Sequence, residues 1–177
     1  MSTGLFPADI IISAREAQQK TGCSASITLA QWALESDYGR YDLGGNNPFG
    51  MKARPQDIAD GNFVVQRTLE WVSSNLRTDW GGYLKCEAKF RKFPTILDAF
   101  IAHGELLMNP RGPYASALPF LKDTKPTVKY ITAMAKTYAT DPDYANKLIA
   151  LVDENKLGQY DLMPGQVRLS VLAAVPQ

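Results

Sequence analysis

The chain has 177 residues, of which 45% are hydrophobic and 21% are charged, so it is long enough for one globular domain with a packed core. Its 19 basic and 18 acidic residues give a formal net charge of +1. This balance argues against a dedicated nucleic-acid-binding protein, which would carry a clustered basic surplus, but it suits a neutral polymer such as a sugar chain. No segment approaches the roughly 20 apolar residues that cross a bilayer.

The N-terminus has neither a basic segment nor an apolar stretch long enough for a signal peptide. If the substrate lies outside the cytoplasm, we therefore expect a non-Sec route of export or release through a pore. The two cysteines, Cys23 and Cys86, lack the spacing of metal ligands, and a chain of this length does not need a disulfide between them. Free, packed thiols are the favoured interpretation.

Two helices are predicted near the N-terminus. The first covers residues 7–19, where apolar residues recur at helical spacing. The second begins near Ser24 or Ser26, either of which can cap it, and ends at a Tyr-Gly pair. Glu35 lies at the edge of its apolar face. The Gly- and Asn-rich residues 41–52 that follow are predicted to form a compact loop.

A β-hairpin is predicted after this loop. Residues 63–71 and 83–90 are short, rich in β-branched or aromatic side chains, and roughly alternating, as strands are. Gln66, Thr68 and Glu70 share one polar face of the first strand, because side chains alternate along a strand.

The remainder of the chain is predicted to be helical. One helix opens at Pro94–Thr95, a second follows Pro126, and a third starts at Asp141–Pro142 with Asp141 as its N-cap. His103, the only histidine, lies on an apolar stripe of the first of these helices. A packing role is favoured for it over catalysis or metal binding.

These elements predict an α+β, mostly helical single domain with one small hairpin beside a cleft that suits a linear polymer. Residues 1–161 form this domain, and residues 162–177 form a C-terminal tail of undefined role. The sequence contains no Ser-His-Asp set, zinc motif, P-loop or dinucleotide fingerprint, and no cofactor or metal is implied.

Glu35 is the candidate catalytic acid. Glycoside hydrolysis needs a protonated carboxylic acid beside the leaving oxygen, with a pKa raised by apolar or partly buried surroundings. Three apolar residues precede Glu35, and a glycine-rich loop follows it. From periodicity alone, an interaction of Glu35 with Arg40 or with a helix terminus is an equally good interpretation.

Five segments of the sequence favour a catalytic role for Glu35 over a merely structural one. They are residues 26–39 (SITLAQWALESDYG), 46–52 (NNPFGMK), 68–71 (TLEW), 90–100 (FRKFPTILDAF) and 137–145 (TYATDPDYA). In the same order they resemble the motifs of the family 73 glycoside hydrolases, the flagellar-type and autolysin-type glucosaminidases, and together they cover roughly residues 7–161. Pro48, Thr95 and Asp98 depart from the family's common residues, and none of these departures touches Glu35.

The resemblance implies a lysozyme-like α+β fold and cleavage of a β-1,4 bond in the glycan strand of bacterial peptidoglycan. It matches the catalytic glutamate of the family to Glu35. It also implicates Glu70 as a base or charge-stabilising group and places Tyr138 near the scissile sugar. Asn47 and Phe49 are then expected to shape the floor of the cleft, and Tyr114 is a candidate for lining a subsite.

The assignment of Glu70 as the second catalytic carboxylate has two alternatives. Glu87, on the partner strand, is the rival of Glu70, although a cross-strand pair with a lysine or arginine explains Glu87 better. Assistance by the substrate's own N-acetyl group needs no second carboxylate. Because Glu70 lies on a hairpin, we expect its carboxylate to be farther from that of Glu35 than the ~5–5.5 Å of a double-displacement pair. For Tyr144 and Asp141, core packing and helix capping are sufficient roles.

The leading hypothesis is a monomeric, endo-acting N-acetylglucosaminidase that acts on peptidoglycan in the bacterial periplasm or cell wall. An N-acetylmuramidase of the same fold is the nearest alternative, and a catalytically silent wall-binding module is an alternative of another class. The same chemistry serves a phage endolysin or a secreted antibacterial effector with a cognate inhibitor or immunity protein. Neither nucleic acid nor membrane insertion is expected.

Overall fold

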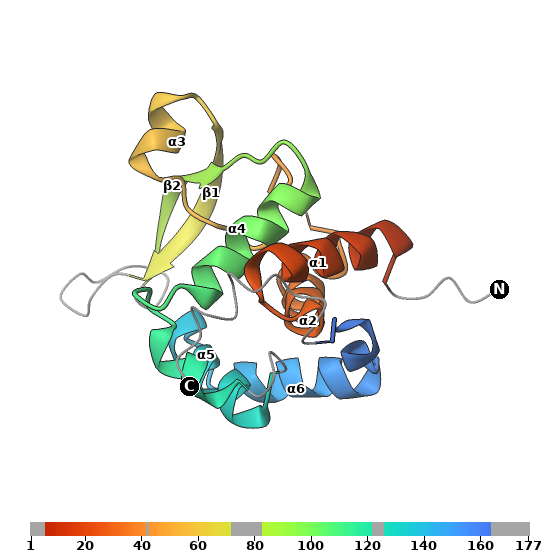
Figure 1. Ribbon diagram of the computed structural model, residues 1–177. Coiled ribbons are helices and arrows are strands. Elements are labelled where there is room, and N and C mark those ends of the chain that lie inside the picture. The colour runs from red at the N-terminus through yellow and green to blue at the C-terminus, as the bar shows by residue number, and fades with distance from the viewer. Residues whose placement is uncertain (1–5, 42, 72–82, 122–125, 164–177) are drawn as a thin grey trace.

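The computed structural model describes residues 6–41, 43–71, 83–121 and 126–163, with the backbone alone for 68–71 and 83–86. The helical body consists of α1 (Ala8–Thr21), α2 (Ala25–Ser36), α4 (Ile96–Met108), α5 (Val128–Tyr138) and α6 (Tyr144–Glu154). A two-stranded antiparallel sheet joins β1 (Phe63–Trp71) to β2 (Tyr83–Arg91). In Figure 1 the hairpin lies at one end of the molecule, α5 and α6 lie at the other, and α1, α2 and α4 lie between them.

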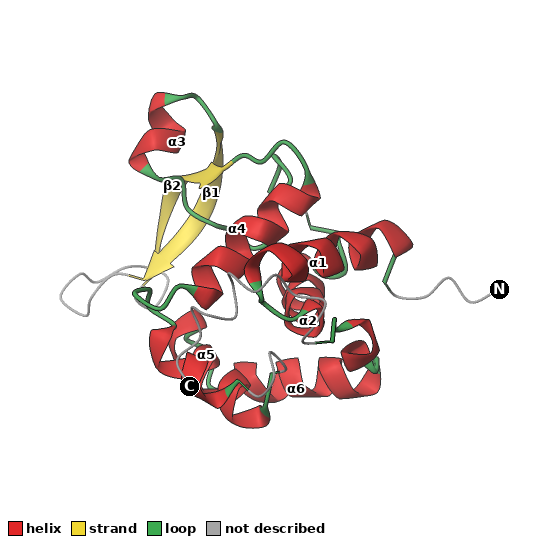
Figure 2. Cartoon of the chain, viewed as in Figure 1, coloured by secondary structure: helices red, strands yellow, loops and turns green. Residues whose placement is uncertain are grey.

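This architecture confirms the predicted α+β, mostly helical fold class, as the colouring in Figure 2 makes plain. The two strands match their predicted ranges to within one residue. Three short elements were not predicted, because each is too short to display a hydrophobic period. They are the helix α3 (Pro55–Ala59) and the 3₁₀ segments η1 (Ala115–Phe120) and η2 (Leu157–Tyr160).

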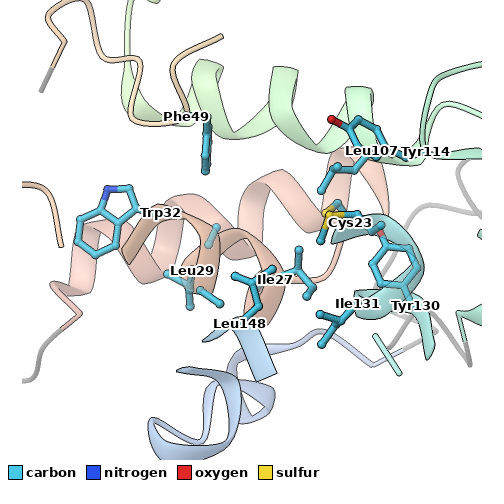
Figure 3. Close-up of a cluster of buried hydrophobic side chains, with 14 of the residues drawn as sticks. Cys23, Ile27, Leu29, Trp32, Phe49, Leu107, Tyr114, Tyr130, Ile131 and Leu148 are labelled. Carbon is cyan, nitrogen blue, oxygen red and sulfur yellow. The ribbon is translucent and has the colours of Figure 1, made fainter. Parts of the chain in front are cut away.

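Helix α2 forms the centre of the core. Every residue of it except Leu34 and Glu35 is buried, so the helix meets other elements on all sides and buries polar as well as apolar side chains. In Figure 3 its side chains lie among those of α4, α5 and α6, such as Leu107, Ile131 and Leu148. Burial of each large aliphatic side chain contributes roughly 1.5–3 kcal/mol, which fixes α2 in place.

The start of α2 is stabilised by distant residues. Ser24 occupies the N-cap position, as predicted, but its side chain makes no capping hydrogen bond. The carboxylate of Asp161 instead accepts hydrogen bonds from the backbone N–H and hydroxyl of Ser26 at 2.8 and 2.9 Å. Gln18 Oε1 accepts from the N–H groups of Ala25 and Leu162. A negative group at this end also suits the helix dipole.

The predicted start of α4 is confirmed. Thr95 is its N-cap, and its hydroxyl accepts a hydrogen bond from the N–H of Asp98 at 3.2 Å. The Asp98 carboxylate accepts in return from the N–H of Thr95 at 3.1 Å. This reciprocal capping box explains why Thr and Asp are compatible with positions where the related family commonly has serine.

The predicted start of α6 is wrong by two residues. The N-cap is Asp143, and the helix begins at Tyr144. Asp141 lies in the preceding turn, where its carboxylate accepts hydrogen bonds from the N–H of Asp143 at 2.9 Å and from Lys147 Nζ at 2.6 Å. These two contacts hold Asp141 outside the helix.

Cys23 is a free, buried thiol, as predicted, and burial raises its pKa to about 12. The side chain of Cys86 lies outside the described residues. Within the described part of the chain, no helix combines the length and the apolar character needed to cross a membrane.

Candidate active site

One cleft collects most of the predicted site residues. It has a volume of about 570 Å³ and is bordered by the end of α2, the 49–51 loop, α4, and the segment from the end of α5 to the start of α6. Its lining includes one glutamate among aromatic rings, namely Glu35, Phe49, His103, Tyr114, Tyr138 and Tyr144. Four of the six predicted site residues therefore lie in the same cleft.

The turn after Glu35 fixes the direction of the glutamate. Ser36 Oγ donates to the carbonyl oxygen of Trp32 at 2.6 Å and accepts from the N–H of Gly39 at 2.9 Å. The two residues between Ser36 and Gly39 are left-handed, with φ of 47° and 57°, and Gly39 itself has φ of 79°. A Cβ at Gly39 would lie 3.0 Å from the Trp32 ring. The serine and glycine of the E-S-x-x-G motif are thus required by the tight exit from α2.

Glu35 has a hydrogen-bond partner that was not predicted. The hydroxyl of Tyr144 donates to Glu35 Oε1 at 2.6 Å, and Gln31 Nε2 donates to the same hydroxyl at 3.2 Å. The cleft walls displace part of the water around the carboxyl group, which raises the pKa of Glu35 above its ordinary value, and the bond from Tyr144 opposes this rise. Tyr144 is buried, as the packing interpretation requires, but it also contacts the acid. The one indication of this contact in the sequence was that Tyr144 lies in the fifth motif, residues 137–145.

The alternative partner of Glu35 is excluded by the geometry. Arg40 Nη1 pairs with Asp37 Oδ2 at 3.3 Å, and both side chains are exposed. Such a pair contributes about 0–1 kcal/mol. No ion pair therefore neutralises Glu35 from this side.

Three tyrosines form one wall of the cleft. The ring of Tyr138 stacks on that of Tyr144, with centroids 5.4 Å apart and planes at 21°, and the ring of Tyr114 lies 6.0 Å from that of Tyr138. Burial, and then the charge of Glu35, raise the pKa of Tyr138 well above its ordinary value. Burial also raises the pKa of Tyr114. Both hydroxyl groups are therefore protonated donors at physiological pH.

Phe49 and His103 continue the aromatic lining, with the His103 ring edge-on to that of Tyr138 at 6.1 Å. The rings of Phe49 and His103 are stacked, with centroids 3.9 Å apart and planes at 13°. His103 is fully buried, and burial lowers its pKa to about 3, so the ring is neutral. His103 has the predicted packing role, but it is fully buried and neither of its ring nitrogens has a hydrogen-bond partner among the described residues. Phe49 keeps 8% of its surface exposed, and this part belongs to the lining of the cleft.

Asn47, predicted to shape the floor of the cleft, is not in its lining. It is fully buried, and its Nδ2 donates to the carbonyl oxygens of Met51 at 2.9 Å and Arg91 at 3.0 Å. Its Oδ1 accepts from the N–H of Met51 at 3.0 Å. Asn47 therefore ties the loop that carries Phe49 to strand β2.

Of the two candidates for the second catalytic carboxylate, the structure describes the side chain of Glu87 but not that of Glu70. The backbone of Glu70 pairs with that of Leu84, but the side chain of Glu70 lies outside the described residues, so its predicted distance from Glu35 stays a prediction. Glu87 lies opposite Arg67, and Arg67 Nε is 4.0 Å from Glu87 Oε1, with both side chains exposed. The cross-strand interpretation of Glu87 is confirmed.

Comparisons with known proteins identify the family of this chain. Residues 12–157 match the family described as "Mannosyl-glycoprotein endo-beta-N-acetylglucosaminidase". The exo-glucosaminidase LytG of Bacillus subtilis is 32% identical over 77% of this chain and 45% of its own length. The peptidoglycan hydrolase FlgJ of Salmonella typhimurium is 31% identical over 85% of this chain and 46% of its own length.

A solved structure extends the likeness to the fold. The catalytic domain of the autolysin Auto from Listeria monocytogenes aligns with a TM-score of 0.68 and 29% identity, covering 86% of this chain and 84% of that one. The chain spans only 25% to 46% of the length of the first curated relatives that it matches. Through the matched family and the order of its five motifs, the chain belongs to the glucosaminidases of glycoside hydrolase family 73.

Proposed function

We propose that this chain hydrolyses a β-1,4 glycosidic bond in the glycan strand of peptidoglycan, as an endo-acting N-acetylglucosaminidase in the bacterial cell wall. The observation that carries the proposal is the setting of Glu35, a carboxyl group of raised pKa in a cleft lined by aromatic rings. A raised pKa keeps a carboxylic acid protonated until it meets the leaving oxygen. The names of the relatives, a glucosaminidase and a peptidoglycan hydrolase, support the same substrate.

The contacts of Glu35 assign a role to each of its oxygens. Oε1 accepts the hydrogen bond from Tyr144, so the acidic proton belongs on Oε2, from which it passes to the glycosidic oxygen. The leaving sugar takes the proton, and Glu35 becomes a carboxylate. The Tyr144 bond is stronger to this charged form, so it assists the transfer. We propose Tyr144 as a positioning residue for the acid.

The remaining groups are proposed to act on the sugar. Glu70 is the proposed base or charge-stabilising group, with the substrate's acetamido group as the alternative. Tyr138 lies beside the acid, and its protonated hydroxyl suits orientation of the acetamido group or of an attacking water. Phe49 and Tyr114, with 8% and 9% of their surfaces exposed, line the cleft and are proposed to contact neighbouring sugars.

The bond that is cut is tested by digesting purified peptidoglycan, reducing the products with borohydride and weighing them by mass spectrometry. New reduced N-acetylglucosamine ends are the expected result. Reduced N-acetylmuramic acid ends would identify a muramidase instead, an outcome favoured by the 27% identity to a probable N-acetylmuramidase of Lactococcus lactis. Products without new reducing ends would make the chain a wall-binding module.

Replacement of Tyr144 by phenylalanine is expected to shift the pH profile of kcat/KM. The Tyr144 hydroxyl lowers the pKa of Glu35, so its loss raises that pKa further. Activity is lost as pH rises through the pKa of the acid, and the alkaline limb therefore moves to higher pH. Turnover falls about tenfold at the same time, the value of a hydrogen bond to a charged group.

Tyr41→Phe is the matched control, because Tyr41 is 73% exposed and lies outside the cleft lining. An alkaline limb at the same pH in Tyr144→Phe and in Tyr41→Phe would reject the positioning role.

A further inference from the structure

Gln31 is a buried polar side chain one helical turn before Glu35 on α2. Residues four positions apart leave a helix on the same face, so the amide of Gln31 and the carboxyl group of Glu35 are neighbours there. Gln31 is fully buried, and burial of an amide costs free energy unless hydrogen bonds compensate for the lost water. An apolar side chain would avoid this cost. The contacts of Gln31 therefore have to explain why a polar group lies here.

The Gln31 amide directs its nitrogen toward two acceptors. Nε2 lies 3.2 Å from the hydroxyl oxygen of Tyr144 on α6 and 3.9 Å from Sδ of Met134 on α5. A thioether sulfur has no proton to donate, so it favours the nitrogen of the amide on this side over the oxygen. Oε1 is buried without a hydrogen-bond partner among the described residues. Gln31 is therefore a donor to Tyr144, with an orientation that Met134 favours.

This orientation determines the direction of the Tyr144 hydroxyl group. The hydroxyl oxygen accepts a hydrogen bond from Gln31, so its own proton is available to Glu35 Oε1, 2.6 Å away. If the amide were turned around, Oε1 of Gln31 would accept that proton, and the hydroxyl could no longer donate to the acid. We call Met134, Gln31, Tyr144 and Glu35, in this order, the donor chain.

The other titratable side chains described in the cleft lining leave this arrangement undisturbed. They are His103 on α4, Tyr114, Tyr138 on α5 and Asp141 before α6. Burial lowers the pKa of the imidazole and raises the pKa of both phenols, so all three rings are neutral. The aspartate is paired with Lys147 Nζ at 2.6 Å. Within the described part of the chain, Tyr144 is the one side chain that donates a hydrogen bond to Glu35.

We propose that Gln31 is a positioning residue, which directs the hydroxyl proton of Tyr144 to Glu35 Oε1 and thereby keeps the acidic proton of Glu35 on Oε2. This role rests on the proposed function, since the choice of oxygen matters only if Glu35 protonates a leaving group. The amide and hydroxyl protons stay bonded to their own atoms throughout. Gln31 acts on the sugar only through Tyr144 and Glu35.

The test follows the charge of Glu35 directly, so that it does not depend on turnover. Chains labelled with ¹³C at the glutamate carboxyl carbon are titrated by NMR, and the signal missing from Glu35→Gln identifies Glu35. Gln31→Met keeps the length of the side chain and removes the amide. A hydroxyl without this donor stabilises the Glu35 carboxylate less, so we expect Glu35 to titrate at higher pH than in the unaltered chain.

A double-mutant cycle separates the direction of the hydroxyl from packing. Gln31→Met in the Tyr144→Phe background should cause no further shift in the titration of Glu35, because the effect of the amide passes through the hydroxyl. In hydrolysis, Gln31→Met is expected to lower kcat about two- to fivefold, within the value of one hydrogen bond, and to leave KM unchanged. An equal shift in both backgrounds, or no shift with Tyr144 present, would overturn the proposal.

Met134→Leu tests the donor chain without altering Gln31. The substitution keeps the volume of the side chain but removes the sulfur that favours the amide nitrogen, so Glu35 should again titrate at higher pH. If Gln31→Met does not fold, this variant decides, and an unshifted titration would reject the role of Gln31. Thr28→Val is the matched control, because it also removes a buried polar group from α2, and the Thr28 hydroxyl donates to the carbonyl oxygen of Ser24, outside the cleft lining.

Turnover tests the proposed function separately. Hydrolysis of peptidoglycan by the unaltered chain is measured through new reducing ends. A chain in which Glu35 titrates as expected in every variant, but which never cuts the glycan, would reject the proposed function and leave the effect of Gln31 on Glu35 supported.

Discussion

Glu35→Gln lowers peptidoglycan turnover by about 10²–10⁴-fold, the range that general acid catalysis contributes. The amide keeps the size of the carboxyl group, and its oxygen can still accept the hydrogen bond from Tyr144, so the melting temperature stays close to that of the unaltered chain. The amide has no acidic proton that it could give to the leaving oxygen. Initial rates of reducing-end release, measured beside the melting curve, separate the two effects.

Glu16→Gln is the matched control for this substitution. Glu16 is an exposed glutamate on α1 and does not line the cleft, so its loss is expected to leave turnover unchanged. A Glu35→Gln protein that keeps more than roughly a tenth of the turnover would falsify the assignment of Glu35 as the general acid.

Glu70→Gln is expected to reduce turnover by more than about tenfold, as loss of a general base or charge-stabilising group does. Glu87→Gln on the partner strand provides the comparison within the same hairpin. The register pairs Glu70 with Leu84 and Glu87 with Arg67, and the ion pair of Glu87 is long and exposed. Its loss should therefore change neither turnover nor the melting temperature.

The ranking of these two variants decides the role of the hairpin. A larger loss in Glu87→Gln would mean that the third motif has been matched in the wrong register. Full activity in both variants would leave the substrate's acetamido group as the assisting nucleophile.

The helices and strands of this chain were largely predictable, because long elements repeat their apolar residues at a fixed spacing. The contacts that cap the helices were less predictable. The start of α2 is held by Asp161, a residue 135 positions away from Ser26, and no local pattern reveals such a partner. Ser24 is at the expected N-cap position, but its side chain supplies no capping hydrogen bond.

Contacts between residues far apart in the sequence also limited the prediction of the candidate site. Glu35, Phe49 and Tyr138 could be placed in one cleft because motifs in the right order identified the family, whereas Tyr114 lies outside these motifs and was only a candidate. The bond from Tyr144 to Glu35 joins residues 109 positions apart, and it exists only because α6 packs against α2. A buried tyrosine has the same sequence signature whether or not its hydroxyl meets an acid.

The bonds from Asp161 and Gln18 to the start of α2 set a limit on how the gene for this domain can be shortened. A fragment that stops before Asp161 leaves the N–H and hydroxyl of Ser26 unpaired, at a cost of roughly 1–3 kcal/mol for each buried group. It also loses the Leu162 N–H that donates to Gln18. The damaged end belongs to the helix whose last turn carries Glu35, so a protease that cut just ahead of Asp161 would disable the enzyme without entering its cleft. Affinity tags and fused partners belong beyond Leu162.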